Sequence, residues 1–440
     1  MAITEARSAA VPRVTLVAVE MGYGHLRAAH ALAEALRAEV LEIDRPPLAS
    51  PEEVRSWRRA RRVYETLSRA SQVPFAGAPL RRLLESLTFI PQLHPARDLS
   101  SPSLGVRALE RFARRGFGRA MLDRLHAENA TLLTTFYAPA VLADHCGYSR
   151  IVCVVTDADV NRVWAVRHAA HTAVHYCAPS ERAARRLAAY GVPENHIHLT
   201  GFPLPPSLVG GGSLVALRRN LAARLVRLDP AGAFLAQSRQ EVGHFVGSLP
   251  AREEGRPPLL TFAIGGAGAQ LRMVRAFLGA LAEPVQRGRL RLALVAGVRR
   301  EVAQRLRRWS VEAGLPDDTG RNVEVLGADS FAEYYERFNA LLAETDILWT
   351  KPSELTFYAA LGIPLVLAPP VGVHERLNRR WARHRGAAFK QESPRLAWHW
   401  LREWLEDGTL AAASWNGYLR MPKFGAARIG EVVASVGNES

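Results

Sequence analysis

The sequence predicts an α/β protein built from two doubly wound domains, and three observations support this fold class. The chain has 440 residues, whereas a single hydrophobic core stops growing at roughly 250–300 residues. Short apolar runs alternate with segments of helical periodicity, a pattern typical of βαβ units and parallel sheets. A stretch rich in proline and glycine, residues 203–258, separates two such series. We therefore expect one domain on each side of it.

In the first half, the apolar run Val14–Val19 predicts a strand, and a glycine-containing turn and a helical pattern over Arg27–Ala38 follow it. A second helix is predicted at Ser180–Tyr190, with Ser180 as its N-cap and Gly191 as its end. Residues 47–128 are rich in arginine and poor in strand signals, so we interpret them as inserted helices and loops. Further predicted strands are Val40–Ile43, Thr131–Thr134, Ile151–Val155, Thr172–Tyr176 and His196–Thr200.

The second half repeats this organisation. A strand is predicted at Leu259–Ile264, where glycines follow it, and a helix at Glu301–Gly314. The remaining predicted strands are Leu290–Ala296, Val323–Val325, Ile347–Trp349 and Pro364–Ala368. The chain thus divides into a first domain, a linker with helical segments, a second domain and C-terminal helices that we expect to cross back to the first domain. Their boundaries are 1–205, 206–258, 259–396 and 397–440.

The composition limits the partners and the compartment. A formal net charge of +15 favours an anionic partner, although the excess is nearly all arginine and could also reflect a GC-rich gene. The charge is scattered and carries no nucleic-acid-binding motif, so a nucleic acid is not expected. The three cysteines have no metal-binding spacing. No run approaches the roughly 20 apolar residues that cross a bilayer. We expect a cytoplasmic protein, either soluble or peripheral on the inner face of the membrane.

A glycine-rich turn follows the first predicted strand, with the sequence Gly22-Tyr23-Gly24-His25. Ligands of open α/β sheets bind beyond the carboxyl ends of the strands, and a neutral imidazole there can remove a proton from a hydroxyl. The alternative for His25 is a capping or packing role. Asp157 follows another predicted strand, where it would orient an acceptor hydroxyl, act as a base or cap the next helix.

The second half contains candidate ligands for an anion. Directly after a predicted strand comes the run Ile264-Gly265-Gly266-Ala267-Gly268-Ala269, whose backbone amides would cradle a diphosphate or form a structural turn. Lys351 would neutralise phosphate charge, and hydroxyl side chains beside it would donate hydrogen bonds. The candidate side chains in this half are Lys351, Ser353, Glu354, Thr356, Glu375 and Asn378.

Together, these motifs resemble the glycosyltransferase family that includes monogalactosyldiacylglycerol synthase, the processive diacylglycerol glucosyltransferases and the lipid-linked N-acetylglucosaminyltransferase of peptidoglycan synthesis. The matching stretches occur in the family's order and span about residues 14–380. They are Gly22–Ala29, Val154–Asp157, Tyr176–Glu181, Gly191–Pro203, Gly265–Gly268, Asp346–Pro352 and Gly362–Pro370.

The resemblance implies a GT-B fold, in which two Rossmann-like domains face each other across a cleft. It implies that the C-terminal domain binds a nucleotide diphospho-sugar, usually UDP-linked, and that the N-terminal domain binds the acceptor. Transfer would invert the anomeric carbon without a metal or other cofactor, with His25 as the base and Asp157 beside the acceptor. Because the family's acceptor is often a lipid, the arginines of the insert would suit an anionic membrane surface or form a solvated face. They include Arg55, Arg58, Arg59, Arg61 and Arg62.

The sequence departs from this family in the donor loop, which usually reads Lys-Pro-Gly-Gly. Ser353 and Glu354 replace the two glycines, and Ala359 stands where the family has a glutamate for the ribose hydroxyls. The following helix is also about two residues short before Gly362. Three functions therefore stay open: a transferase with a changed donor pocket, a binding protein that keeps only the cleft, and a nucleotide-sugar epimerase or hydrolase.

Overall fold

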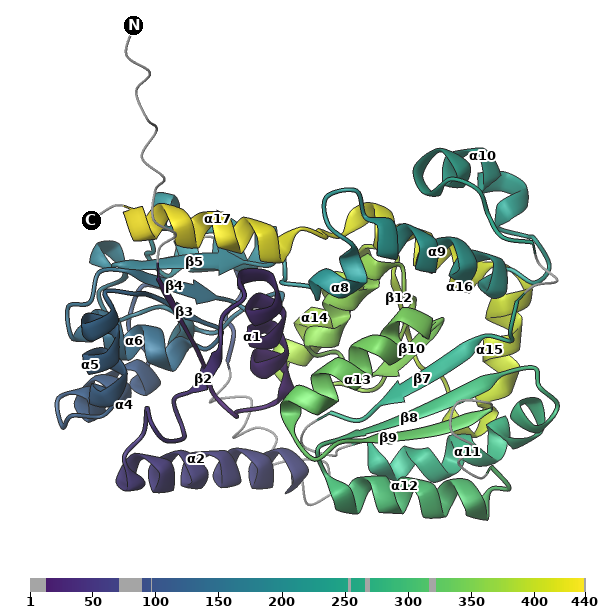
Figure 1. The fold of residues 1–440 in the computed structure, drawn as a ribbon, viewed down its shortest axis with the longest axis horizontal. Coiled ribbons are helices and arrows are strands. Elements are labelled where there is room, and N and C mark those ends of the chain that lie inside the picture. Colours follow the sequence, from purple (N-terminus) through teal and green to yellow (C-terminus); the bar gives the residue numbers. More distant parts are fainter. Residues whose placement is uncertain are drawn as a thin grey trace, which may run out of the picture.

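Two parallel six-stranded sheets, one in each half of the chain, form the framework of the protein (Figure 1). The first has the strand order β2-β1-β3-β4-β5-β6 and the second β12-β11-β10-β7-β8-β9. In both, the first strand of the half has neighbours on each side, which is the doubly wound arrangement. The predicted two-domain α/β architecture is therefore confirmed. The computed structural model describes residues 13–70, 89–95, 97–251, 255–265, 270–315 and 322–438.

The strands of the first sheet lie close to their predicted positions. They are short and largely buried, because helices cover both faces of a parallel sheet. The fifth strand begins at Val174, two residues later than predicted, because Thr172 ends a 3-10 turn and its Oγ1 accepts a hydrogen bond from the Val174 amide (3.0 Å). The strands are β1 (Val14–Ala18), β2 (Val40–Glu42), β3 (Thr131–Thr134), β4 (Ile151–Val154), β5 (Val174–Ala178) and β6 (Ile197–Leu199).

The helices of the first half include the predicted inserted region, whose described residues form helices and loops. Ser180 caps α7 as predicted, because its Oγ accepts a hydrogen bond from the Ala183 amide (3.1 Å). The first helix begins at Tyr23 and so includes part of the glycine-rich turn that the sequence analysis placed before it. The helices are α1 (Tyr23–Leu36), α2 (Pro51–Ala70), α4 (Leu104–Ala113), α5 (Arg119–Glu128), α6 (Tyr137–His145) and α7 (Glu181–Ala189), with 3-10 turns η1 (Arg162–Trp164), η2 (Ala169–His171) and η3 (Glu194–His196).

The second sheet contains one strand that the sequence analysis missed, β12 (Ala388–Lys390), an edge strand of three residues with a single buried side chain. Such a short segment carries no recognisable alternation of apolar and polar residues. The other strands are β7 (Leu259–Ala263), β8 (Arg291–Gly297), β9 (Val323–Gly327), β10 (Ile347–Thr350) and β11 (Leu365–Leu367). The helical segments around them are α11 (Leu271–Gln286), α12 (Arg300–Glu312), α13 (Phe331–Glu344), η5 (Glu354–Leu361), α14 (Val373–His384) and η6 (Pro394–Leu396).

The segment between the two sheets packs on the second half. Arg224 of its longest helix is fully buried and donates hydrogen bonds to the carbonyls of Thr345 (2.7 Å) and Leu361 (2.9 Å). These bonds fix the segment to the loops around β10. Its helices are α8 (Pro206–Val209), α9 (Val215–Leu228) and α10 (Leu235–Val246).

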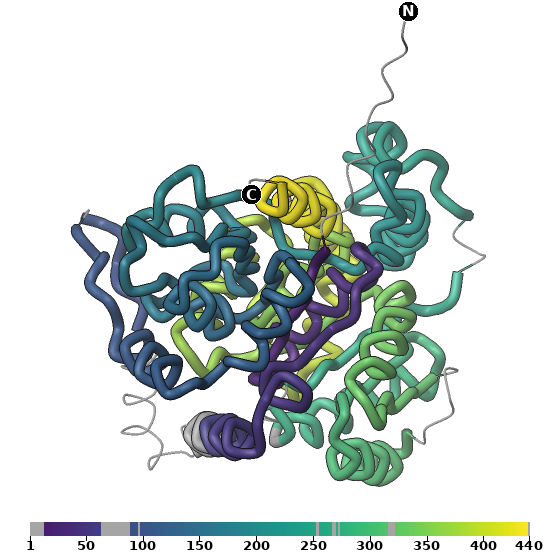
Figure 2. The backbone as a smooth tube through the Cα atoms, turned by 60° about the vertical axis from the view of Figure 1, so that its left-hand side comes forward, coloured from purple at the N-terminus to yellow at the C-terminus, as the bar shows by residue number. Residues whose placement is uncertain are grey.

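The last three helices connect the two halves. α15 (Ala397–Glu406) and α16 (Thr409–Arg420) pack on the second half, against α11 and α9. α17 (Gly425–Asn438) then lies along the first sheet, as the yellow helix over β3–β5 in Figure 1 shows. Ile429 and Val433 of α17 share a buried cluster with Leu16 of β1 and Val154 of β4. Figure 2 shows the purple helix α1 between the two halves, where it contacts α13.

Candidate active site between the two sheets

The carboxyl ends of strands from both sheets meet at a cavity of about 130 Å³. The loops after β1 and β4 form one wall, and the loops after β7, β10 and β11 form the other. Of the candidate residues from the sequence, Thr356 and Asn378 are buried outside the cavity lining, and Gly266 and Gly268 lie outside the described residues. The other candidate residues line the cavity: Gly22, Tyr23, Gly24, His25, Asp157, Gly265, Lys351, Ser353, Glu354 and Glu375.

His25 is held in one tautomer by the loop after β3. Its Nδ1 lies 2.8 Å from the carbonyl oxygen of Thr135, and a carbonyl can only accept, so Nδ1 carries the hydrogen. The Thr135 hydroxyl in turn donates to the carbonyl of His25 (2.8 Å), and the Thr156 hydroxyl oxygen lies 3.1 Å from Nδ1. The other ring nitrogen, Nε2, is therefore left with a lone pair. This is the protonation pattern that a general base requires.

The charge state of His25 follows from its surroundings. Burial lowers the pKa of His25, while the carboxylates of Asp157 and Glu354 act in the opposite direction without overcoming it. Because the ordinary pKa of histidine is about 6.5, a lowered pKa keeps the imidazole neutral at physiological pH. The ring can therefore accept a proton.

Asp157 accepts a hydrogen bond from a residue of the opposite half. Asn378 Nδ2 donates to Asp157 Oδ1 (2.8 Å), and Asn378 Oδ1 accepts from the Ala158 amide (2.8 Å). Asn378 Nδ2 also lies 3.2 Å from the Pro352 carbonyl in the loop after β10. One buried side-chain amide therefore connects the loop after β4 with the loop after β10. Asp157 does not cap the next helical turn, which begins after Asn161.

Lys351 and Glu375 form an ion pair in the second wall, with 2.7 Å between Lys351 Nζ and Glu375 Oε1. The Val371 amide donates to the other carboxylate oxygen of Glu375 (2.8 Å). Burial alone would raise the pKa of Glu375, but Lys351 and His374 lower it. The Lys351 side chain lies directly over Gly265, where a Cβ would come within 2.5 Å of Lys351 Cε. The glycine therefore provides the space that this lysine occupies.

Glu354, which departs from the family pattern, is paired with Arg27 of the first half. Arg27 Nε lies 3.5 Å from Glu354 Oε1, and both side chains are buried. Arg27 Nη2 donates to the Tyr334 hydroxyl (2.6 Å), and the guanidinium lies 4.6 Å from the ring centroid of Phe338. A Cβ on Gly24 would come within 3.1 Å of Glu354 Oε2, so this carboxylate lies against the turn that precedes His25.

Several residues in or beside the site were not predicted from the sequence. Arg27 lies on α1 of the first half, and nothing in its position in the sequence indicated that residues of the second half would bury it. His374 lines the cavity beside Glu375. Because Glu375 was already a candidate residue, the adjacent histidine could have been predicted as well. Tyr334 comes from α13, far along the chain, where an amphipathic helix gave no sign of a site.

The two halves are closed against each other around the cavity. The Tyr23 hydroxyl accepts a hydrogen bond from the Val298 amide (3.1 Å), and its ring packs against Phe331 and Tyr334. Small-molecule sites usually enclose about 300–1,000 Å³, which is more than this cavity holds. A ligand of nucleotide-sugar size would therefore require these walls to separate.

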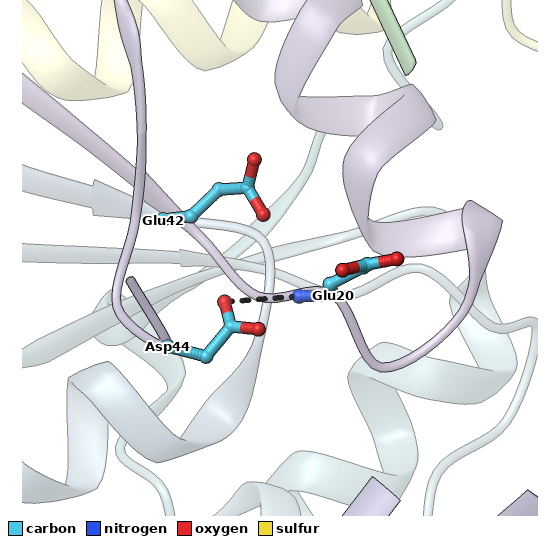
Figure 3. A group of neighbouring side chains, drawn as sticks. All are labelled: Glu20, Glu42 and Asp44. Carbon is cyan, nitrogen blue, oxygen red and sulfur yellow. Dashed lines mark hydrogen bonds between the residues drawn. The ribbon is translucent and has the colours of Figure 1, made fainter. Parts of the chain in front are cut away.

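A group of three carboxylates lies near the carboxyl ends of β1 and β2 (Figure 3). Glu20, Glu42 and Asp44 bring oxygens within 4.8 Å of one another, and the Glu20 amide donates to Asp44 Oδ1 (3.3 Å). Arg45 contacts Glu20 (2.5 Å) and Glu42 (3.2 Å), and Arg61 contacts Glu20 (2.6 Å). The arginines supply the counter-charge, so we interpret the group as an ion-pair network.

Comparison with known proteins establishes the fold class. No protein-family model matches the sequence, and no curated protein is similar to it in sequence. The structure is similar to a Listeria monocytogenes protein assigned as a UDP-N-acetylglucosamine 2-epimerase, with a TM-score of 0.50, 11% identity and 97% of each chain covered. It is also similar to MurG from Acinetobacter baumannii (TM-score 0.49, 12% identity, 96% of this chain and 100% of that chain). A third similar structure is the glycosyltransferase SnogD from Streptomyces nogalater (TM-score 0.46, 15% identity, 96% and 99%). At this identity the first similarity shows the fold alone, and the predicted GT-B arrangement of two facing Rossmann-like domains is confirmed.

Proposed function

We propose that the protein is a glycosyltransferase that moves a sugar from a nucleotide diphospho-sugar, most simply a UDP-sugar, to a hydroxyl of a lipid or other acceptor. The observation that carries this proposal is the hydrogen bond from His25 Nδ1 to the Thr135 carbonyl. It leaves Nε2 of a neutral, cavity-lining histidine ready to take a proton, as a base-catalysed transfer requires.

In the proposed reaction, His25 Nε2 removes the proton of the acceptor hydroxyl. The oxygen then attacks the anomeric carbon from the face opposite the leaving group, so the configuration inverts and the bond to the diphosphate breaks with its electron pair. Lys351 and the amides at the start of α14 support the departing charge, since a cation and a helix N-terminus both favour an anion. Asp157 lies beside the acceptor, and these protein groups supply the charge without a metal ion.

A binding protein that no longer transfers sugar is the second candidate, and a specific observation favours it. Glu354 brings a carboxylate into the cavity lining, and Lys351 is already paired with Glu375. A bound diphosphate would have to compete with Glu375 for Lys351 and tolerate Glu354. In this case the nucleotide sugar binds but no glycosylated product forms.

Calorimetry against UDP-, GDP-, ADP- and dTDP-sugars separates a donor-binding protein from an empty scaffold. We expect one of them to bind, and absence of binding at millimolar concentration would remove the basis of both candidates. A turnover assay then measures glycosylated product and free sugar separately. Product on the acceptor supports transfer, and free sugar formed without acceptor indicates a hydrolase. An altered nucleotide sugar indicates an epimerase. Binding without any reaction indicates the second candidate, the binding protein.

The role of His25 has its own test. His25→Ala should reduce turnover by roughly 10²–10⁴-fold, the usual contribution of a general base, while the donor affinity stays nearly constant. His126→Ala, at an exposed position on α5, is the matched control and should leave turnover unchanged. A His25→Ala variant with the rate of the parent protein would exclude His25 as the base.

For the location of the protein, we propose the cytoplasmic side of an anionic membrane surface. α2 carries exposed arginines at positions 55, 58, 59 and 62, and each basic residue near anionic lipid adds about 1 kcal/mol. None of the described helices combines the length and the apolar character that a membrane span needs. Flotation with neutral and anionic vesicles tests this, and equal recovery with both would favour a solvated helix face.

A further inference from the structure

A group of arginines lies on α14, outside the cavity lining. Helical residues three, four and seven positions apart share one face, and this spacing relates Arg376 to Arg379, Arg380 and Arg383. We call these four residues, with His384, the arginine face. They line a surface hollow of about 250 Å³. The buried residues of the same helix are Glu375, Asn378, Trp381 and Ala382.

Among the described residues, three arginines of the arginine face lack the counter-charge that several other helices provide for an arginine. On α5 and α13, and at the end of α11, an arginine pairs with a glutamate one turn away, as Arg337 does with Glu333 (3.1 Å). α14 has one acidic residue, Glu375, which pairs with Lys351 in the cleft. Within the described part of the chain, Arg379, Arg380 and Arg383 form no ion pair.

This concentration of charge is unfavourable for the isolated protein. Like charges four residues apart on a helix repel, as Arg379 and Arg383 do. Partial burial lowers the pKa of Arg379, and the charges of Arg383 and Arg376 lower it further. The helix dipole favours cations in the last turn, where Arg383 and His384 lie, but it gives no advantage to the arginines nearer the start. A bound anion would relieve this repulsion.

We propose that the arginine face binds a phosphate group, carried either by the headgroup of an anionic lipid or by a soluble phosphate compound. Guanidinium groups present paired N–H donors that match phosphate oxygens, and the hollow gathers several of them around one position. The site is separate from the cleft, so it does not depend on the proposed sugar transfer. It lies on α14, the helix whose Glu375 lines the cavity.

The test uses the full chain with three arginines replaced together, Arg379→Gln, Arg380→Gln and Arg383→Gln. The matched control carries Arg107→Gln, Arg111→Gln and Arg114→Gln, which remove the same charge from exposed positions on and just after α4. Binding of inorganic pyrophosphate is measured by calorimetry. Binding to phosphatidylcholine vesicles with and without phosphatidic acid is measured by flotation.

We expect the α14 variant to bind at least one phosphate probe about a hundredfold more weakly than the parent, since each arginine near anionic lipid contributes about 1 kcal/mol. The α4 control should stay close to the parent. If only vesicle binding is lost, the phosphate is that of a lipid headgroup. If only pyrophosphate binding is lost, it is that of a soluble compound. If both are lost, the face recognises the phosphate group that the two sources share.

Two results would overturn the proposal. If both triple variants lose binding equally, net charge rather than the arginine face attracts the anion. If the parent protein binds neither pyrophosphate nor phosphatidic acid vesicles, the face is not a phosphate site. Unfolding temperature and nucleotide-sugar affinity, measured on each variant, show whether the fold and the cleft are intact, so failure here is distinguishable from failure of the proposed transferase function.

Discussion

At the scale of the residue, the neutral state of the partly buried His25 determines how activity should depend on pH. Protonation of Nε2 removes the base, so activity falls as the pH drops through the pKa of His25. Burial lowers that pKa, and we therefore expect the acidic limb of the kcat/KM profile to lie below the ordinary histidine value of about 6.5. A limb at or above that value would contradict the assignment of His25 as the base.

The pairing of Arg27 with Glu354 explains how the chain accommodates a buried carboxylate beside the turn that precedes His25. Burial alone would lower the pKa of Arg27, but the surrounding phenols and Glu354 raise it. We expect Arg27→Met to destabilise the protein by about 3–5 kcal/mol, because it leaves Glu354 buried without its partner. Denaturant unfolding measures this loss.

A double-mutant cycle separates the ion pair from general packing. Glu354→Gln alone should also destabilise, whereas adding it to Arg27→Met should cost little more, since the unpaired carboxylate is then gone. A coupling free energy of about 0.5–3 kcal/mol is expected for groups in direct contact. Additive losses would show that Arg27 and Glu354 contribute independently.

Sequence reasoning could place His25, Asp157, Lys351 and Glu375 near one another because each follows, or closely follows, a strand end, and strand ends gather at one edge of a sheet. It could not find the partner of Glu354. The position of Arg27 looks like an ordinary turn of α1, and its aromatic surroundings come from α13 and η5 in the other half. Such a contact exists only once the two domains are placed together.

At the scale of the element, η5 shows how the winding of a helix sets the length that a given number of residues can span. Its eight residues, Glu354–Leu361, form a 3-10 helix, which rises about 2.0 Å per residue, so it extends about 16 Å. An α-helix would need ten to eleven residues for about the same length, at about 1.5 Å each. The 3-10 winding therefore lets the eight residues of η5 span a length that an α-helix would reach only with more residues.

The end of η5 depends on Gly362, which has a φ of +69° and whose added Cβ would lie 2.5 Å from Leu221 Cδ1. Gly211 has nearly the same φ, +70°, and open space around it. We expect Gly211→Ala to cost about 1 kcal/mol of unfolding free energy for the left-handed backbone alone. Gly362→Ala should cost about 1–3 kcal/mol more because of overpacking. Equal losses in thermal or denaturant unfolding would mean that Leu221 moves away freely.

The elements that could be predicted are those with strong local signals. Most strands were predicted to within two residues at each end, because buried parallel strands are continuous apolar runs. Ser180 was recognisable because an N-cap is a local feature. β12 was missed because its three residues depend on pairing with β11 rather than on their own pattern. Local sequence thus predicts the sheets better than their edges.

At the scale of the whole molecule, the two halves are held together by polar contacts as well as by apolar packing. Asn378 bridges Asp157 and Ala158, and Glu34 accepts a hydrogen bond from the Tyr335 hydroxyl (3.0 Å). The cavity between the halves has a volume of about 130 Å³. A closed protein must open before it binds a larger ligand. Its apparent affinity is therefore the affinity of the open form multiplied by the fraction of molecules that are open.

His30 makes this closure sensitive to acid. Its ring lies between α1 and α13, with centroids 5.1 Å from Phe331 and 5.2 Å from Tyr335. Burial, with a further contribution from Arg27, lowers the pKa of His30 to about 4. Between pH of about 6.5 and about 4, the unfolded chain therefore binds a proton that the folded protein does not, so stability falls as the pH drops through this window.

We expect His30→Gln to reduce this loss of unfolding free energy between neutral and mildly acidic pH, because glutamine takes up no proton in either state. The measurement is the free energy of unfolding at a series of pH values, with His126→Gln as an exposed control on α5. Hydrogen exchange at α13 should report the same change locally, since a charged His30 is less favourable than a neutral one in its partly buried place beside Phe331 and Tyr335. An identical pH dependence in His30→Gln and the parent would mean that other groups control the acid sensitivity and that the α1–α13 contact remains closed as the pH falls.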